Sequence, residues 1–164
     1  MTQQASPVHI RSATADDVAM IVEFNRLLAV ESEDRELDVA VLTRGVERAL
    51  AQPDLCRYFM AEIAGQIVGQ TMLTYEWSDW RCGVFWWIQS VFVVPEHRSR
   101  GVFRALYQHI KSLAQSDGGI CGLRLYVEQH NHPALATYGR MGMSPTGHLM
   151  YEDDWSGAVK KIGE

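Results

Sequence analysis

The sequence predicts a single domain of the α/β (α+β) class, a mixed sheet with helices on both of its faces. Segments of strand-like composition and segments of helical spacing alternate along the chain, as in layered domains that combine sheet and helix. The 164 residues suffice to bury one hydrophobic core, and 47% hydrophobic and 21% charged residues are ordinary for a globular protein. Because no repeat, linker or low-complexity segment divides the chain, one domain is expected over 1–164.

Strands are expected where β-branched and aromatic residues cluster between turn residues. In chain order, the expected strands cover 8–11, 58–63, 67–75, 84–94, 123–128 and 148–152. Helices are expected where apolar residues recur at a spacing of three or four. In chain order, the expected helices cover 14–30, 39–50, 102–113 and 132–141.

Capping and breaking residues set the ends of these elements. The run that begins at Thr14 is typical of a helix start, and Pro53 ends the second helix. Pro95 ends the long central strand because it has no N–H to donate to a sheet. Asn131 is a good N-cap for the last helix, and Gly142 is a natural stop for it.

The turn between the central strand and the third helix is rich in arginine. Arg98, Arg100 and Arg104 flank Ser99 and Gly101 at the point where helical spacing begins. The first turn of a helix has unpaired N–H groups and the positive end of the helix dipole, and glycine allows close approach, so this turn suits an anion. A P-loop would need Gly-Lys-Ser/Thr and a dinucleotide fingerprint would need three glycines, and this turn has neither.

The turn resembles the pyrophosphate loop of the GNAT superfamily of acyl-CoA-dependent N-acyltransferases. The family pattern is Gln/Arg-x-x-Gly-x-Gly/Ala at the start of a central helix, and here it reads Arg98-Ser99-Arg100-Gly101-Val102-Phe103. Phe103 departs from the small residue that is usual at the last position.

Two further segments are similar to motifs of the same family. About thirty residues downstream, the family has an Asn after a strand, a helix of small residues, an aromatic residue and a Gly-Phe pair. The corresponding residues here are Asn131, Ala134, Ala136, Tyr138 and Gly142-Met143. The pattern Ile10-Arg11-x-Ala13-Thr14-x-x-Asp17 is also a common opening in the family.

The resemblance implies the GNAT fold, with a mostly antiparallel central sheet of six to seven strands, and a site for acetyl-CoA as cosubstrate without a metal. In the family, the strand before the loop is bulged and splays from its neighbour. Backbone groups at Phe92 and Val94 would therefore pair with the pantetheine arm. The cofactor-binding residues that the resemblance implies are Phe92, Val93, Val94, Arg98, Ser99, Arg100, Gly101, Val102, Phe103, Arg104 and Asn131.

The resemblance also assigns the catalytic chemistry. Tyr138 matches the aromatic position whose hydroxyl lies near the thioester sulfur, so it is the candidate general acid for the leaving thiolate. In polyamine-type members a Glu relays the amine proton, and Gln89, which cannot accept a proton, occupies that position here. Three carboxylates are alternative candidates for the base: Glu31, Glu33 and Glu128.

Two functions are therefore compared. The first is an N-acetyltransferase that transfers the acetyl group of acetyl-CoA to a primary amine of a small molecule or peptide, by direct transfer in a ternary complex. The second is a GNAT-fold module that binds acyl-CoA as a sensor with little catalysis, which Gln89 and Phe103 would favour. Tyr138 favours the enzyme.

The amine acceptor is less constrained. Four tryptophans, Trp77, Trp80, Trp86 and Trp87, crowd the region of the expected acceptor groove, although aromatic residues in strands most often pack in the core. Neighbouring strand residues face opposite sides, so Trp86 and Trp87 cannot both line one pocket. Acidic residues over 31–36 and 152–154 would attract a cationic amine or would simply form a solvated face.

Charge and composition disfavour other partners. A net charge of −5 argues against nucleic acid, and neither a signal peptide nor a membrane-spanning apolar run is seen, so a cytoplasmic location is expected. The three cysteines, Cys56, Cys82 and Cys121, lack the spacing of a metal site and are expected to be free thiols. The resemblance allows a homodimer formed through the C-terminal strands.

Overall fold

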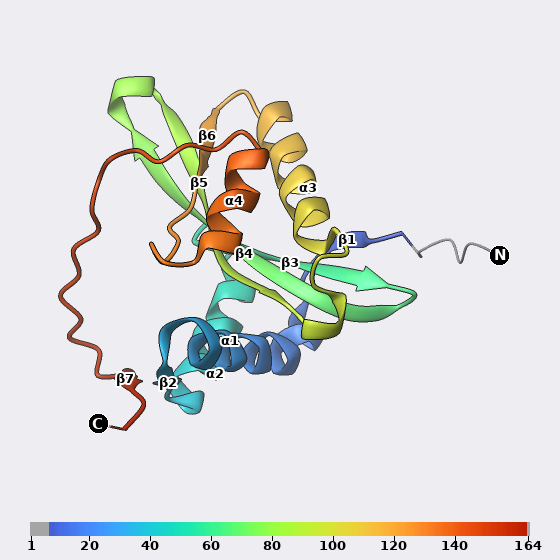
Figure 1. Ribbon diagram of the computed structural model, residues 1–164, viewed down its shortest axis with the longest axis vertical. Coiled ribbons are helices and arrows are strands. Elements are labelled where there is room, and N and C mark those ends of the chain that lie inside the picture. The colour runs from blue at the N-terminus through green and yellow to red at the C-terminus, as the bar shows by residue number, and fades with distance from the viewer. Residues whose placement is uncertain (1–6, 164) are drawn as a thin grey trace.

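The computed structural model, which describes residues 7–163, contains a five-stranded sheet in the order β1-β3-β4-β5-β6 (Figure 1). Its strands are β1 (His9–Ser12), β3 (Cys56–Ile63), β4 (Gln66–Ser78), β5 (Gly83–Val93) and β6 (Ile120–Arg124). Every neighbouring pair is antiparallel except β5 and β6, which run parallel. The expected mixed, mostly antiparallel sheet is confirmed, with five strands in place of six to seven.

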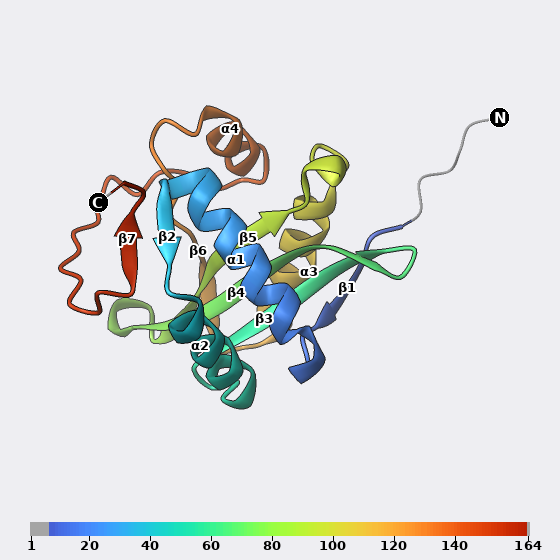
Figure 2. The same ribbon diagram turned by 90° about the horizontal axis from the view of Figure 1, so that it is seen from below.

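Helices cover both faces of the sheet, as Figures 1 and 2 show. The helices α1 (Val18–Glu33) and α2 (Val39–Ala51) lie on one face, and α3 (Val102–Ser116) and α4 (His132–Arg140) lie on the other. The alternation of side chains along each strand supplies both cores. Phe59 packs in the core under α3, whereas its neighbours Tyr58 and Met60 pack in the core under α1 and α2.

The same alternation separates the tryptophans. Trp86 is buried in the core under α3, whereas Trp87 lies on the opposite face, where its ring is 6.0 Å from that of Tyr126. Trp77 and Trp80, near the end of the β4–β5 hairpin, are largely exposed. The expectation that Trp86 and Trp87 face different sides is confirmed.

The C-terminal region differs from the expectation. Residues 148–152 form no strand, and Leu149 and Tyr151 are exposed; in Figure 1 this orange-to-red segment runs along the outside of the molecule. Instead, β7 (Val159–Lys161) pairs with β2 (Arg35–Leu37) as a separate two-stranded sheet. The prediction of a strand at 148–152 was wrong because apolar side chains alone do not give a segment a hydrogen-bonded partner.

The strand expected at 123–128 also begins and ends earlier. β6 covers Ile120–Arg124, and the chain leaves the sheet after Arg124.

In residues 7–163 no helix has the length and apolarity needed to cross a membrane.

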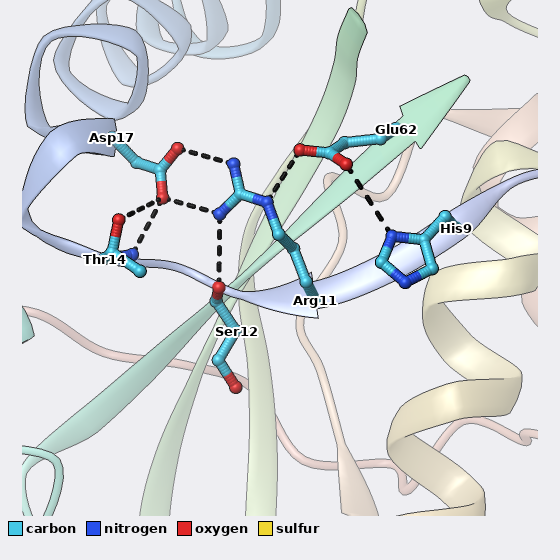
Figure 3. A network of polar contacts seen from close by, with 6 residues as sticks. All are labelled: His9, Arg11, Ser12, Thr14, Asp17 and Glu62. Atoms are coloured by element: carbon cyan, nitrogen blue, oxygen red, sulfur yellow. Dashed lines mark hydrogen bonds and ion pairs between the residues drawn. The ribbon is translucent and has the colours of Figure 1, made fainter. Parts of the chain in front are cut away.

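Arg11 anchors the start of the chain to the sheet and to the first helical turn (Figure 3). Its two Nη atoms donate to the carboxylate of Asp17 at 2.7 and 2.8 Å, and its Nε donates to Glu62 at 2.6 Å. Asp17 also accepts the backbone N–H of Thr14 at 2.7 Å, and this bond caps the first helical turn at the expected position. The hydrogen bonds from Arg11 hold the pKa of the buried Asp17 carboxyl below its usual value.

Replacing Arg11 tests this anchor. Arg11→Met leaves the Asp17 carboxylate buried without its cation, and we expect the free energy of unfolding at pH 7 to fall by about 2 kcal/mol. Because the pKa of Asp17 is lowered in the folded state, its contribution is present above its ordinary pKa and is lost as pH falls. Urea titrations of both proteins at pH 7 and at acid pH should show the difference shrinking in acid. A difference independent of pH would contradict this role.

Candidate functional site

A bulge in β5 opens the sheet next to the arginine-rich turn. Gln89 pairs with Met72 and Phe92 pairs with Gln70, so Ser90 and Val91 together lie opposite the single residue Thr71. Ser90 adopts a left-handed conformation with φ of 50°, and the Thr71 hydroxyl donates to the carbonyl oxygen of Gln89 at 3.0 Å. A bulge bends and twists a strand, and this one lies where β5 separates from β6.

The separation leaves the last part of β5, beyond Trp87, without a neighbouring strand on the side of β6. β5 pairs with β6 only as far as Trp87 and Arg124, while β5 itself continues to Val93. The bulge and splay that the family resemblance implied are therefore present. Backbone groups along the last residues of β5 face a gap rather than a strand.

A buried polar network supports the bulge from the α1 side. The Gln70 amide donates from Nε2 to Asn25 Oδ1 at 2.8 Å and, more weakly, to the carbonyl oxygen of Ser90 at 3.4 Å. Asn25 in turn donates to the hydroxyl of Tyr58 at 3.1 Å, and burial raises the pKa of Tyr58. Sequence analysis missed this network, although a Gln inside the apolar run 67–73 is a signal of a buried polar partner.

A cavity of about 1140 Å³ extends from the end of β5 along the cleft between α3 and α4. Its lining includes these residues implied by the family resemblance: Val93, Arg98, Ser99, Gly101, Val102, Phe103, Arg104 and Tyr138. It also includes residues that the sequence analysis did not assign: His97, Tyr107, Gln108, Lys111, Pro133, Ala134, Thr137, Arg140 and Met141. For Gln108 and Lys111, the available signal was their spacing of four and seven residues from Arg104, which places all three on one face of a helix.

Four of the implied residues do not line the cavity. Phe92 is buried on the other face, with its ring 4.9 Å from that of Phe24, and Arg100 is exposed on the turn. Asn131 caps α4, accepting the N–H of Ala134 at 3.2 Å. Val94 donates its N–H to Val68 of β4 at 3.0 Å.

The bond from Val94 corrects the choice of backbone groups at the open edge. Val94 points its N–H toward β4, and Phe92, two residues earlier and paired with Gln70, turns the same way. Neither residue can therefore offer its backbone to a ligand in the gap. By alternation the backbone of Val93, between them, faces the gap.

The start of α3 has the features of an anion site. Gly101 is the N-cap with φ of 84°, and a Cβ built there would meet nothing within 4 Å. Within residues 7–163, no side chain caps this helix start. First-turn N–H groups are therefore open to a ligand in the adjoining cavity, beside Ser99 and Arg104.

Tyr138 projects from α4 toward α3. Its ring lies 5.5 Å from that of Phe103 in an edge-to-face arrangement, and both side chains line the cavity. Burial raises the pKa of the Tyr138 hydroxyl, so the group keeps its proton at neutral pH. The bulky residue at the last position of the loop thus packs against the candidate acid.

The candidates for the base differ in their partners. Glu31 forms an ion pair with Arg98 at 2.6 Å, and Glu128 accepts the N–H of His130 at 2.7 Å. Gln89 donates to the Thr74 hydroxyl and accepts from the Tyr126 hydroxyl, the latter at 3.3 Å. Burial raises the pKa of Tyr126, and the nearby carboxylates of Glu33 and Glu152 raise it further.

Glu76 lies on the same face and is held by two donors. The Trp87 indole and Arg124 both bond its carboxylate, the latter at 2.8 and 2.9 Å, and these bonds lower its pKa. Glu76 therefore stays ionised and is poorly suited to accept a proton. Among the described residues, no group of three His, Cys, Asp or Glu side chains is arranged to hold a metal ion.

Comparison with known proteins identifies relatives over most of the chain. Residues 22–143 match the profile of the acetyltransferase (GNAT) family. A Bacillus subtilis (strain 168) protein named "Uncharacterized N-acetyltransferase YhfO" is 27% identical over 146 residues, which cover 88% of this chain and 95% of that protein.

Solved structures share the fold. A "possible acetyltransferase from Clostridium difficile 630" is 44% identical with a TM-score of 0.82, covering 90% of this chain and 97% of the other. A Clostridium acetobutylicum "predicted acetyltransferase with acetyl-CoA" is 18% identical with a TM-score of 0.71, covering 90% and 96% of the two chains.

The support of the bulge by Thr71 is testable. Thr71→Val removes the hydroxyl donor to Gln89 at nearly constant volume, and we expect the free energy of unfolding to fall by about 1 kcal/mol. Amide hydrogen exchange at Ser90 and Val91 should become faster. Thr71→Ser, which keeps the hydroxyl, is the matched control. Equal exchange rates at Ser90 and Val91 in the wild type and the Val variant would show that the bulge does not depend on this bond.

Proposed function

Because the chain belongs to the acetyltransferase (GNAT) family, we propose that it transfers the acetyl group of acetyl-CoA to a primary amine of a small molecule or peptide. Transfer is direct, in a ternary complex, without a covalent acyl-enzyme. One observation carries the proposal: a single cavity joins the uncapped start of α3, the end of β5 and the protonated hydroxyl of Tyr138.

The cavity fits the chemistry of a CoA thioester. Its volume of about 1140 Å³ suits a large ligand, and its α3 end offers N–H groups and Arg104 to the pyrophosphate. Exposed Arg100 adds charge on the same turn. The Val93 N–H at the open edge of β5 is the candidate donor to the pantetheine arm.

Transfer moves the acetyl group from sulfur to nitrogen, so a proton must leave the amine and another must reach the thiolate. Tyr138 would donate to the thiolate, since its raised pKa keeps the proton available. Backbone N–H groups at the free edge of β5 would polarise the thioester carbonyl. Placement of both reactants in one site supplies the remaining acceleration.

The amine is proposed to enter from the α1 side of the gap. Gln89, Trp87 and Tyr126 lie there, near the carboxylates of Glu33 and Glu152. Aromatic rings and carboxylates favour a cationic amine. Gln89 would orient the amine or a water molecule rather than remove the proton. The proton lost by the amine would pass to solvent water or to one of the candidate carboxylates, and Tyr138 would regain its own proton from solvent.

Besides acetyl-CoA and the amine acceptor, a second copy of the chain is proposed as a partner. Large apolar side chains of the segment between α4 and β7 are exposed: Leu149, Met150, Tyr151 and Trp155. An exposed apolar segment of this kind is typical of a surface that another chain covers.

The proposed activity is tested with acetyl-CoA and a panel of amines, including polyamines, lysine peptides and aminoglycosides. We expect release of free CoA thiol that depends on the acceptor. Calorimetric titration with CoA is the parallel measurement. Binding of CoA without acceptor-dependent thiol release from any amine would support the sensor module in place of the enzyme.

Replacing Tyr138 tests the general acid. Tyr138→Phe keeps the ring against Phe103 and should lower kcat by about 100-fold with nearly unchanged affinity for CoA. Because the acid must be protonated and its pKa lies above the ordinary value of 10, Tyr138 itself should cause no loss of activity through mildly alkaline pH. An equal loss of affinity and kcat would indicate a packing role.

A further inference from the structure

Arg98 joins two segments that are far apart in the sequence. Its Nε donates to the carbonyl oxygen of Val93 at 2.9 Å, and its Nη2 donates to Oε2 of Glu31 at 2.6 Å. The guanidinium also lies over the ring of Phe92, with its central carbon 5.6 Å from the ring centroid. The side chain therefore connects the last turn of α1 with the open edge of β5.

The bond to Val93 lies at the edge that β6 leaves free. Val94 bonds to β4, so the carbonyl of Val93 faces the gap, and Arg98 occupies it. A planar guanidinium with two bonds of fixed direction restrains this backbone more than a single flexible donor would. A ligand lying along the edge would find the carbonyl of Val93 already bonded and its N–H free to donate.

The charge of Arg98 is also already paired. Glu31 balances it, so a bound pyrophosphate would have to displace a carboxylate to reach the guanidinium. Arg104 and Lys111 line the same cavity, and within residues 7–163 neither takes part in an ion pair. These two cations are the more direct partners for phosphate oxygens.

We propose that Arg98 is a positioning residue for the acyl-CoA site: it holds the open edge of β5 to the end of α1, while Arg104 supplies charge to the pyrophosphate. This inference rests on the proposed function, because it concerns the binding of the same cosubstrate. It assigns Glu31 the role of a structural anion, which removes that carboxylate from the candidates for the base.

The decisive variant is Glu31→Gln, because the two possible roles of Arg98 predict opposite signs. If Arg98 positions the edge, loss of its anchor weakens CoA binding by about two- to fivefold, the range for an exposed ion pair. If Arg98 were a phosphate ligand restrained by Glu31, the same change would release it and tighten CoA binding. Tighter or unchanged binding in a calorimetric titration overturns the proposal.

A truncated cosubstrate separates the two arginines. Acetyl-pantetheine keeps the thioester arm and lacks the pyrophosphate. Arg98→Met should lower kcat/KM by about tenfold with both acetyl-CoA and acetyl-pantetheine, because the edge that orients the arm is lost. Arg104→Met, the matched control, should lower kcat/KM with acetyl-CoA alone.

Arg98→Lys completes the set. Lysine keeps the positive charge without the planar fork, so it should not restore kcat/KM with acetyl-pantetheine. Recovery in Arg98→Lys, or a loss confined to acetyl-CoA in Arg98→Met, overturns the positioning role. Circular dichroism checks that each variant folds. If Arg98→Met does not fold, the Glu31→Gln variant, which changes an exposed side chain, still decides between the two roles of Arg98.

A failure of the proposed function can be distinguished from a failure of the proposed role of Arg98. A wild-type protein that neither binds CoA nor releases thiol from acetyl-CoA contradicts the family activity itself. A wild-type protein that binds CoA, together with tighter binding in Glu31→Gln, contradicts only the role of Arg98.

Discussion

The hydrogen bond from the Thr71 hydroxyl to the carbonyl oxygen of Gln89, with Ser90 in a left-handed conformation, holds an extra residue in β5. A left-handed serine costs about 1 kcal/mol or more, so the surrounding structure has to enforce it. Gln70, Asn25 and Tyr58 do so from the α1 side, as a buried polar network. The bulge bends β5 just beyond its last pair with β6, beside the open edge, and Val93 near the end of the bent strand lines the cavity.

The bulge also explains why the backbone groups at the edge were the hardest part of the site to predict. In a regular strand, alternation fixes which residues face which side. Here Gln89 and Phe92, three residues apart, face the same side because the bulge inserts one residue between them. After the bulge, the alternation of side chains and of backbone N–H and C=O groups between the two sides is shifted by one residue. Val93, Phe92 and Val94 were all expected at the site, and this shift leaves the backbone of Val93 facing the gap while Val94 bonds to Val68 of β4.

Local patterns predicted more of the fold than of the site. Spacing and caps located all four main helices, because those signals lie within a few residues of one another. The strand at 148–152 failed since pairing depends on a partner elsewhere in the chain. The bond between Glu31 and Arg98 spans 67 residues and follows from no local pattern. The arginine-rich turn and the position of Tyr138 were recognisable because the family motifs are themselves local.

The residues proposed to take part in the reaction lie on opposite faces of the sheet. Tyr138 and the start of α3 lie on one face, whereas Gln89, Trp87 and Tyr126 lie on the face of α1. A regular sheet would separate these groups by a continuous layer of backbone. The splay between β5 and β6 removes that layer at one point, so a thioester from one side and an amine from the other could meet there. That geometry favours direct transfer, since neither substrate has to leave before the other arrives.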